Sequence, residues 1–460
     1  MAPVGVRGAT VSLVATLAAS GLVGCGGSSP SRKHVAAAQP GNQVAAVSGQ
    51  PPATTTAPAQ TTPAPTAGGM LELRQSLHHW LAEAGPNVGV YIFDLNDGKP
   101  VYALNDKVGR APASVEKLYT TTAALTDLGP GERLTTEVLG TGSMGAHGVW
   151  HGDLYLRGGG DPTFGSAAFV KAWGGGEGST VEELADQLVS KLKIRRVSGH
   201  VIADGTLFDA RPGGPATGYK PDTPDFGGEL GALTYNHGAV LKIGASPAVF
   251  AAQQLSADLR RAKVAARTLK VSGRAPAGAA VLATVRSPSI STLVRLMDVP
   301  SDDLYAEMLT EQLGSRLGRR GTIADGAQVI AQAIAQYGIH PRIVDGSGLS
   351  RSNRSSPYQV VKLLADLWHT PTGRVLVDAL PVVGQSGTTK RIAAGTVAAG
   401  RCVAKTGTLN YVTNLAGYCS GASGQKLAFA LFIDGPGNAR ALELIGRIVT
   451  DMVRLDVTRP

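Results

Sequence analysis

The chain has 460 residues, of which 43% are hydrophobic and 17% charged, and it is long enough for two or three domains with sizeable cores. The formal net charge is +9, but Lys and Arg are scattered, so we expect attraction to an anionic cell wall or membrane and no nucleic-acid partner. The chain has nine histidines and three cysteines, and we predict neither a metal site nor a cofactor.

The N-terminal segment has the features of an export signal. Arg7 precedes an apolar run, residues 9–23, which is too short to predict a transmembrane helix. The run ends in Leu22-Val23-Gly24-Cys25, which resembles the bacterial lipoprotein cleavage box, where the cysteine is lipidated and becomes the mature N-terminus. An ordinary secretory signal and an uncleaved anchor are the alternatives. All three predict a protein outside the cytoplasm, at the outer face of the cytoplasmic membrane or in the cell envelope.

Residues 26–69 form the next segment, which is rich in Pro, Ala, Thr, Gln and Ser and has almost no large apolar residues. Such a segment cannot bury enough surface to offset its ordering entropy, so we predict a disordered linker. A flexible linker of this length spans roughly 35–40 Å root-mean-square, which lets a folded part reach away from the membrane.

The folded part is expected to begin at Met70. Residues 70–84 carry apolar side chains at helical spacing and predict an amphipathic helix. Two strand-like runs, 88–93 and 101–104, flank Asn96-Asp97-Gly98, which is typical of a β-hairpin.

The next helix is predicted to begin near Ala111 and to run to Leu128, and it contains Ser114 and Lys117. Residues three apart on a helix share a face, so the Ser114 hydroxyl and the Lys117 amine should be adjacent. A serine hydroxyl becomes a nucleophile when a base takes its proton, and a lysine amine can be that base where burial or a nearby cation favours its neutral form. Alone the pattern is weak, because an N-cap serine followed by a surface lysine looks the same.

The remaining chain predicts a long β-rich, glycine-punctuated stretch between more regular segments. This stretch covers residues 134–285, a helix follows at 301–317, and the chain ends in a helix at 439–455. Between the last two helices we predict a meander of three strands, at residues 401–408, 412–419 and 427–434. An antiparallel sheet packed between helices, of the α/β (α+β) class, fits this order of elements.

Two further short motifs follow the Ser-x-x-Lys pair in a meaningful order. They are Ser301-Asp302-Asp303 and Lys405-Thr406-Gly407. The three motifs in this order are the signature of penicillin-binding proteins and class A β-lactamases, with aspartate here where asparagine is usual.

The chain resembles the low-molecular-mass class C penicillin-binding proteins, the D-alanyl-D-alanine carboxypeptidase/endopeptidases. The resemblance runs from about Leu71 to about Asp434. Longer motifs carry it together with the short ones: Leu156–Pro162, Ser198–Asp204, Asp345–Ser350 and Ala404–Leu409. It implies the penicillin-binding-protein/serine β-lactamase-like transpeptidase fold, with residues 70–131 and 286–460 as the catalytic domain and 132–285 as an inserted accessory domain.

The resemblance also implies a serine DD-carboxypeptidase that cleaves D-Ala-D-Ala in peptidoglycan stem peptides and is acylated by β-lactams. Ser114 would attack the carbonyl, Lys117 would accept its proton, and Ser301 would relay a proton to the leaving amine. Lys405 and Thr406 would hold the substrate carboxylate. The balance between carboxypeptidase and endopeptidase action, and the oligomeric state, stay open.

Further substrate contacts are implied at Gly407, Thr408 and Asp303. The backbone N–H groups of Ser114 and Thr408 would form an oxyanion hole, in which each donor is worth roughly 3–4 kcal/mol. An ionised aspartate at position 303 only accepts hydrogen bonds, whereas asparagine also donates. Its charge beside Lys117 would also favour the protonated amine and make that amine a weaker base.

Two rival functions stay open at this point. One is a β-lactamase or esterase of the same fold, although the sequence offers no obvious extra base for fast deacylation. The other is a non-catalytic cell-wall-binding scaffold, in which Asp303 marks a decayed site; the presence of Ser114, Lys117, Ser301 and Lys405 argues against decay.

The remaining two cysteines predict a disulfide. Asn410-Tyr411 lies midway between Cys402 and Cys419, so a tight hairpin about that midpoint places the two cysteines opposite each other. An oxidising compartment would favour the bond. Two small buried thiols without a bond are the alternative.

Overall fold

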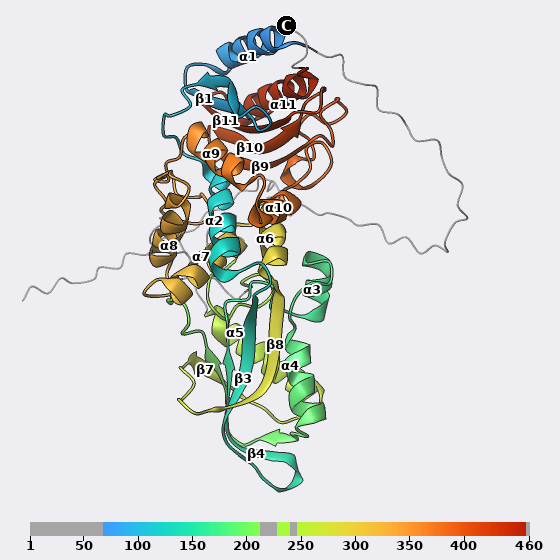
Figure 1. Cartoon of the computed structure of the whole chain (residues 1–460). Helices are drawn as coiled ribbons and strands as arrows, with labels where there is room; N and C mark the ends of the chain where they lie inside the picture. The colour runs from blue at the N-terminus through green and yellow to red at the C-terminus, as the bar shows by residue number, and fades with distance from the viewer. Residues whose placement is uncertain (1–67, 212–227, 240–245, 457–460) are drawn as a thin grey trace, which may run out of the picture. The chain divides into compact units, whose positions relative to one another are not determined.

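The computed structural model describes residues 68–211, 228–239 and 246–456 (Figure 1). The predictions for the signal segment, for Cys25 and for the linker up to residue 67 lie outside these ranges. Within them, no helix is both long enough and apolar enough to cross a membrane.

A five-stranded antiparallel sheet joins the two ends of the described chain. Its strand order is β2-β1-β11-β10-β9, so β9, which carries Lys405, lies at an edge. The strands are β1 (Val88–Asp94), β2 (Lys99–Leu104), β9 (Cys402–Leu409), β10 (Val412–Ser420) and β11 (Lys426–Asp434). The predicted hairpin and the predicted three-stranded meander therefore meet in one sheet, through antiparallel pairing of β1 with β11.

Strand β11 shows why the central strands read as continuous apolar runs. Successive side chains point to opposite faces of a strand. Leu427, Phe429 and Leu431 belong to one buried cluster, while Ala428 and Ala430 belong to another. Both faces of the sheet are therefore covered, which excludes the apolar–polar alternation of a half-exposed strand.

Two helices from opposite ends of the described chain cover the first face. They are α1 (Met70–Ala84) and α11 (Asn438–Arg454), which lie side by side over the sheet (Figure 1). Each buries one stripe of apolar side chains, Leu73, Leu77 and Leu81 on α1 among them, against the same cluster.

The second face is covered by the helices that carry the predicted nucleophile and its neighbours. The segment predicted as one helix from 111 to 128 divides into a 3-10 turn η1 (Ala113–Glu116), α2 (Lys117–Ala123) and a π turn η2 (Ala124–Leu128), and it ends at Gly129. Helices α7 (Asp303–Leu317), α8 (Ile323–Ala335), α9 (Pro357–Leu367) and α10 (Pro371–Ala379) also contribute to the buried cluster on this face. Helix α6 (Ile290–Asp298) packs in an adjoining cluster, and the short η6 (Gly387–Thr389) precedes β9. Helix α7 starts two residues later than predicted, because Ser301 has a left-handed φ of +65° and Asp302 caps the helix.

The stretch between α2 and α6 forms a second, six-stranded sheet with its own core. Its order is β7-β6-β4-β3-β8, with β5 paired to β4. The strands are β3 (Arg133–Met144), β4 (Val149–Arg157), β5 (Arg196–Val197), β6 (Val201–Asp204), β7 (Thr268–Ser272) and β8 (Ala280–Ser289), with a short turn η3 (Ala146–Gly148) between β3 and β4. Strand β3 pairs antiparallel with β4 and β8, whereas β6 runs parallel to both β4 and β7.

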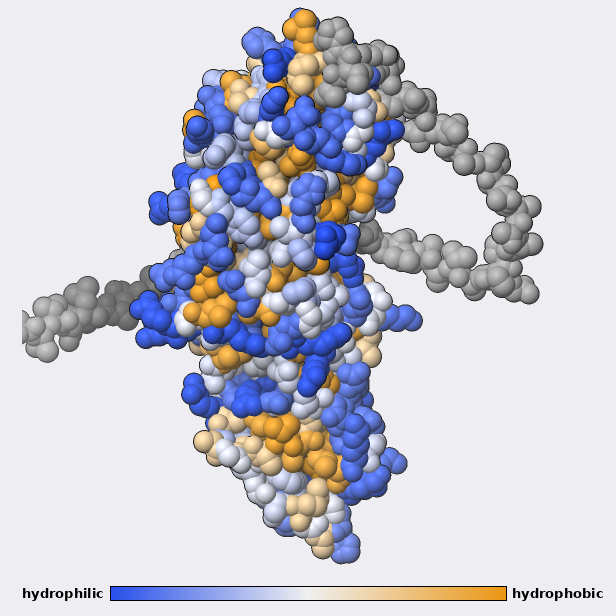
Figure 2. Space-filling view, in the orientation of Figure 1, coloured by the Kyte–Doolittle hydropathy of each residue, from blue (hydrophilic) through white to orange (hydrophobic). Residues whose placement is uncertain are grey.

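This second part is a mixed α/β unit rather than a purely β-rich one. Three helices and a π turn accompany its sheet: α3 (Ala167–Trp173), α4 (Val181–Asp186), η4 (Gln187–Lys191) and α5 (Pro247–Arg261). Figure 2 shows apolar surface over the region of β3 and β8, strands on which the large apolar side chains of Met144 and Val281 are exposed.

Candidate active site

Ser114 lies in the η1 turn at the start of α2 and is partly exposed. The preceding residue, Ala113, has a left-handed φ of +48°, which a non-glycine residue adopts only under strain. Gly348 allows this turn, because a Cβ at position 348 would lie 1.9 Å from the Ala113 carbonyl oxygen, and its own φ is +87°. The sequence Asp345-Gly346-Ser347-Gly348 is therefore tied to the nucleophile by close backbone packing.

Strands β9 and β10 fix the same turn from the side of the sheet. A Cβ on Gly407 would lie 2.5 Å from the Pro112 carbonyl oxygen, so the glycine of the Lys-Thr-Gly motif is required by the close approach of two backbones. Asn414 on β10 donates from Nδ2 to the carbonyl oxygens of Ala111 and Pro112, both at 2.9 Å. The turn that carries Ser114, the predicted nucleophile, is thus positioned by strands β9 and β10 rather than by a free loop.

Lys117 is fully buried beneath Ser114. Its Nζ lies 3.0 Å from Ser114 Oγ, 2.6 Å from Asp303 Oδ1 and 2.8 Å from the Ser347 carbonyl oxygen. Asp303, in the first turn of α7, brings the second motif into direct contact with the first. The structure therefore places the predicted base within hydrogen-bond reach of the predicted nucleophile.

The second serine and the second lysine form a matching pair. Lys405, fully buried on β9, donates from Nζ to Ser301 Oγ at 2.7 Å and to the Thr406 carbonyl oxygen at 3.0 Å. The left-handed backbone of Ser301 turns this residue out of the helix that follows it. Ser114, Lys117, Asp303, Ser301 and Lys405 therefore meet in one place, although they come from three separate segments of the chain.

Thr406, Gly407 and Thr408 continue along the edge strand. Thr406 is buried and donates to Thr388 Oγ1 at 2.7 Å, whereas Thr408 is exposed. An edge strand with an exposed residue near its end offers backbone N–H and C=O groups to an extended ligand.

Asp302, the middle residue of the second motif, is held by a histidine from the inserted stretch. His237 Nε2 lies 2.7 Å from Asp302 Oδ2, and the other carboxylate oxygen accepts from the Tyr305 backbone N–H at 3.0 Å. Burial acts to raise the pKa of Asp302, but the charge and hydrogen bond of His237 outweigh it, so the pKa is lowered. Asp302 therefore stays ionised as the cap of α7 and joins the inserted stretch to the Ser301 turn.

Two carboxyl groups hold the loop at 345–350, one on helix α7 and one in the loop itself. Glu307 accepts from the backbone N–H groups of Ser347 at 2.9 Å and Gly346 at 3.3 Å. Asp345 accepts from the Gly348 and Ser350 backbone N–H groups at 2.9 and 2.6 Å. These bonds orient the Ser347 carbonyl, which accepts from Lys117, and so they fix the base indirectly.

Burial controls the charges of the site. The pKa of Lys405 is lowered to about 7, chiefly by burial and then by the charge of Lys117. Burial raises the pKa of Asp303, although the charge and hydrogen bond of Lys117 oppose it. It also raises the pKa of Asp298, at the end of α6, to about 6, against the opposing charge of Lys405, and that of Glu307 to about 8 with help from the Asp345 charge. The site thus holds several groups whose protonation can change near neutral pH.

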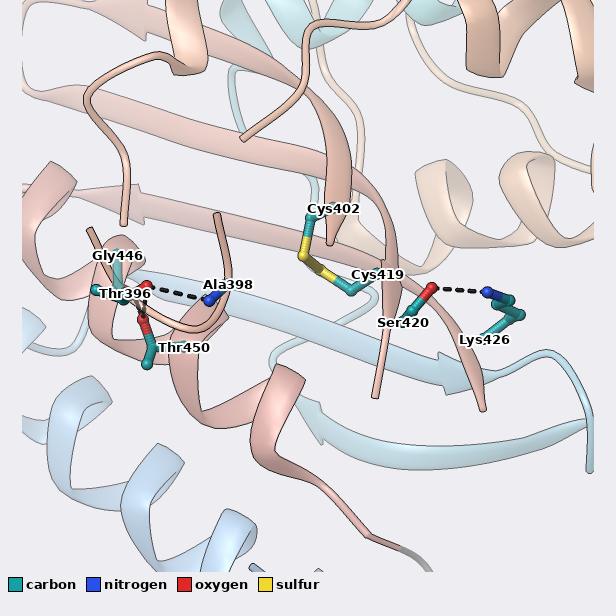
Figure 3. The surroundings of a disulfide bond; sticks show 8 residues. All are labelled: Thr396, Ala398, Cys402, Cys419, Ser420, Lys426, Gly446 and Thr450. Atoms are coloured by element: carbon teal, nitrogen blue, oxygen red, sulfur yellow. Dashed lines mark hydrogen bonds between the residues drawn. A yellow bond between two sulfur atoms is a disulfide. The ribbon is translucent and has the colours of Figure 1, made fainter. Parts of the chain in front are cut away.

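A disulfide closes the β9–β10 hairpin near this site. The register pairs Cys402 with Cys419 and Lys405 with Ala416, and a bond joins the two cysteines, whose Cα atoms are 4.1 Å apart (Figure 3). Figure 3 also shows Lys426, which donates to Ser420 Oγ at 2.7 Å beside the disulfide. The strand that carries Lys405 is therefore tied covalently to its neighbour three residues before the lysine.

Chemically, the arrangement can run acyl transfer through a serine ester. It has a partly exposed hydroxyl with an amine in contact, a second hydroxyl–amine pair beside it, and a strand edge for the substrate. Among the described ranges, no group of three or more His, Cys, Asp or Glu residues could hold a metal ion.

The contributors that the sequence did not predict include His237, Asp298, Glu307 and Asn414. Glu307 lies four residues after Asp303, one helical turn on, and that spacing was an available signal. His237 and Asp298 carry no local pattern that predicts their contacts, because their partners lie 65 and 177 residues away.

Comparison with known proteins gives a match over most of the chain. The sequence model of the family described as D-Ala-D-Ala carboxypeptidase 3 (S13) matches residues 73–242 and 227–452. Carboxypeptidase DacB of Mycolicibacterium smegmatis is 31% identical over 395 residues, which cover 80% of this chain and 82% of that protein. The D-alanyl-D-alanine carboxypeptidase of Actinomadura sp. strain R39 is 27% identical over 454 residues, which cover 80% of this chain and 81% of that protein.

The fold has a counterpart among solved structures. Penicillin-binding protein 4 of Haemophilus influenzae superposes with a TM-score of 0.69 at 19% identity and covers 84% of this chain and 99% of that one. The same protein in complex with a β-lactam superposes with a TM-score of 0.62 at 22% identity, covering 82% and 97%. The predicted fold class is confirmed.

Proposed function

Because the chain belongs to the D-Ala-D-Ala carboxypeptidase 3 (S13) family, we propose that it removes the terminal D-alanine of peptidoglycan stem peptides through an acyl-enzyme on Ser114. The observation that carries the proposal is the double serine–lysine contact, Lys117 to Ser114 at 3.0 Å and Lys405 to Ser301 at 2.7 Å. This geometry gives the nucleophile a base and leaves a second hydroxyl for the leaving group.

In the acylation step, Ser114 Oγ attacks the carbonyl carbon between the two D-alanines while its proton passes to Lys117 Nζ. The backbone N–H groups of Ser114 and Thr408 stabilise the oxyanion. The C–N bond then breaks, and the amine leaves with a proton relayed through Ser301. Water hydrolyses the ester and returns Ser114 to its free form.

The substrate lies along β9 in this proposal. Residues 402–404 of β9 are already bonded to residues 381–383, so an extended peptide adds to the edge of β9 beyond Ala404. Its terminal carboxylate meets Lys405 and the Thr406 hydroxyl. β-Lactams present a carboxylate and a strained amide in a similar arrangement and acylate the same serine.

The family places the protein at the cell envelope, where peptidoglycan lies. We further propose that it is exported and held at the outer membrane face by a lipid on Cys25, with the following segment as a tether. This rests on the cleavage-box sequence and the composition of the following segment. The tether was predicted to span residues 26–69, but it ends before Gly68, which pairs with Leu455. We also propose residues 70–131 and 286–460 as the catalytic domain and 132–285 as the insertion, because the described strands of the second sheet come from 133–289. The last four residues of β8 extend past the proposed boundary at 285.

Two assays test the activity. Fluorescent penicillin should label the wild-type protein, and a D-Ala-D-Ala pentapeptide should release D-alanine. Ser114→Ala should abolish both, whereas Ser352→Ala, which changes an exposed serine of a nearby loop, should retain both. Labelling that persists in Ser114→Ala would overturn the mechanism. Rapid turnover of a chromogenic cephalosporin without release of D-alanine would point instead to a β-lactamase.

A further inference from the structure

The contacts of Lys117 raise a problem for its role as a base. Its Nζ lies within hydrogen-bond distance of three oxygen atoms, on Ser114, Asp303 and Ser347. An ammonium group has three N–H donors and no acceptor. A neutral amine could keep two of these bonds, to Asp303 and Ser347, and accept from the Ser114 hydroxyl. The Asp303 carboxylate at 2.6 Å favours the protonated amine instead, which has no lone pair to offer to Ser114.

Only one of these three oxygens belongs to a group that can take the spare proton. Ser347 contributes a backbone carbonyl, and Ser114 is the nucleophile whose own proton must leave. Asp303 contributes a carboxylate at the shortest of the three distances, 2.6 Å. Building on the function proposed above, we propose that Asp303 is a catalytic residue that takes a proton from Lys117 before Ser114 attacks.

The step balances within the pair. The Nζ–H bond of Lys117 breaks and an O–H bond forms on Asp303 Oδ1, so an ammonium and a carboxylate become a neutral amine and a neutral acid. No proton enters from or leaves to water. The amine then has a lone pair and takes the Ser114 proton as Oγ bonds to the substrate carbonyl carbon.

The neutral acid also restores a donor at this position. A protonated carboxyl has one O–H donor and keeps acceptor capacity, which is the combination that an asparagine amide offers. Asp303 can then accept from Lys117 and donate to a substrate carbonyl. One proton transfer thus frees the base and removes the difference between aspartate and the usual asparagine.

The surroundings favour the neutral form of the pair when a substrate covers it. The Lys117 side chain is 0% exposed and that of Asp303 is 15% exposed. A substrate that covers Asp303 therefore removes the last water from the pair. Two opposite charges lose hydration in a dry site, and two neutral groups lose less. Burial already raises the pKa of Asp303 in the unliganded protein.

Other charged groups act on the pair from the neighbouring elements. Lys405 on β9 opposes a proton on Asp303, while the adjacent Asp302 favours it. The carboxylates whose charges interact with Lys117 come from the η1 turn, from the end of α6, from the second motif and from the 345–350 loop: Glu116, Asp298, Asp302 and Asp345.

The pH dependence of acylation separates this mechanism from a permanent ion pair by its sign. If Asp303 takes the proton, activity falls at low pH only when the pair gains a second proton, which is the titration of a carboxyl group. If Asp303 stays ionised throughout, its negative charge only stabilises the protonated amine, which cannot act as a base. The acid limb is the fall of the acylation rate at low pH. Removing the Asp303 carboxylate moves this limb to higher pH if Asp303 takes the proton, and leaves it in place or moves it to lower pH if Asp303 stays ionised.

The experiment measures the second-order rate of acylation by fluorescent benzylpenicillin from about pH 5 to about pH 10 in the whole protein. We expect the acid limb of Asp303→Asn to lie about one pH unit or more above that of the wild type, with a loss of about tenfold near pH 6 and similar rates at the alkaline end. Asp303→Ala should show the same limb and a lower plateau, because it loses the proton acceptor and the substrate contact together.

Asp298→Asn is the matched electrostatic control. It removes another buried carboxylate, one that is bonded to Thr121 at 2.6 Å. A general loss of negative charge makes the amine easier to deprotonate, so this variant should move the limb downward or leave it in place. A limb for Asp303→Asn that is unmoved, moves down, or moves together with that of Asp298→Asn would overturn the proposal. Failure of the proposed function shows itself separately, as wild type that is not labelled or as Ser114→Ala that is.

Discussion

Removal of the Cys402–Cys419 disulfide should destabilise the catalytic part by an amount set by the loop that it closes. The two cysteines are 17 residues apart in sequence. The chain-entropy relation for a loop of this size gives about 3 kcal/mol at 25 °C, which the cross-link removes from the unfolded state. Reduced protein keeps the same side chains, so comparing reduced with oxidised wild type isolates the bond from any cavity left by a substitution.

The assay equilibrates each sample in urea and then applies a short pulse of fluorescent penicillin, which labels only molecules with a formed site. The reduced protein should unfold at lower urea, by the equivalent of about 3 kcal/mol. The Cys402→Ala/Cys419→Ala double variant should behave like reduced wild type or slightly worse, and should not respond to reductant. A difference of less than about 1 kcal/mol between oxidised and reduced wild type would refute the loop-closure reasoning.

Three further predictions follow from the site and the N-terminus. Lys405 has a pKa lowered to about 7, chiefly by burial, so it is charged below that pH and neutral above it; kcat/KM for a carboxylate-terminated pentapeptide should fall as pH rises through about 7, and a flat profile from about pH 6 to 8.5 would contradict this. His237→Ala should slow acylation about tenfold while the fold persists, because it frees Asp302 and the Ser301 turn, and His237→Gln should retain more activity since its amide can donate; equal rates in both variants and wild type would rule out this role. Cys25→Ser should abolish membrane association, measured by fractionation and intact mass, and an unchanged distribution would disprove the lipid anchor.

The parts of the fold that sequence predicts well are those set by local spacing. The helix at 70–84 and the strands of the meander follow from side-chain periodicity within a few residues. The pairing of Cys402 with Cys419 follows from simple counting about a tight turn. The contact between Ser114 and Lys117 is also local, because it spans one turn of helix.

The helices of the inserted stretch show the opposite case. Helices α3 and α4 have seven and six residues, too few for helix propensity to stabilise them alone. Their stability comes from packing: Val181, Leu184 and Ala185 of α4 lie in the core of the second sheet. A sequence rich in glycine therefore predicted strands where tertiary contacts select helices.

The contacts between the site residues could not be predicted from the sequence, for a related reason. Asp303 meets Lys117 across 186 residues of sequence, and the left-handed turn at Ser301 is imposed by its surroundings rather than by its side chain. The consequence of aspartate at 303 could be posed from the sequence, but only the three contacts of Lys117 indicate where a proton can go.

The distances along the chain between partners also set an order of events in folding. The second sheet takes its strands from one continuous stretch, 133–289, and can close before the rest of the protein exists. The first sheet cannot, because β1 joins β2 to the rest of the sheet through the late strand β11, with Val88 paired to Ile433. Contacts of such long range form slowly, since a large loop must close first. Ser114 is synthesised long before Lys405, so an incomplete chain carries the proposed nucleophile without the proposed substrate-binding lysine.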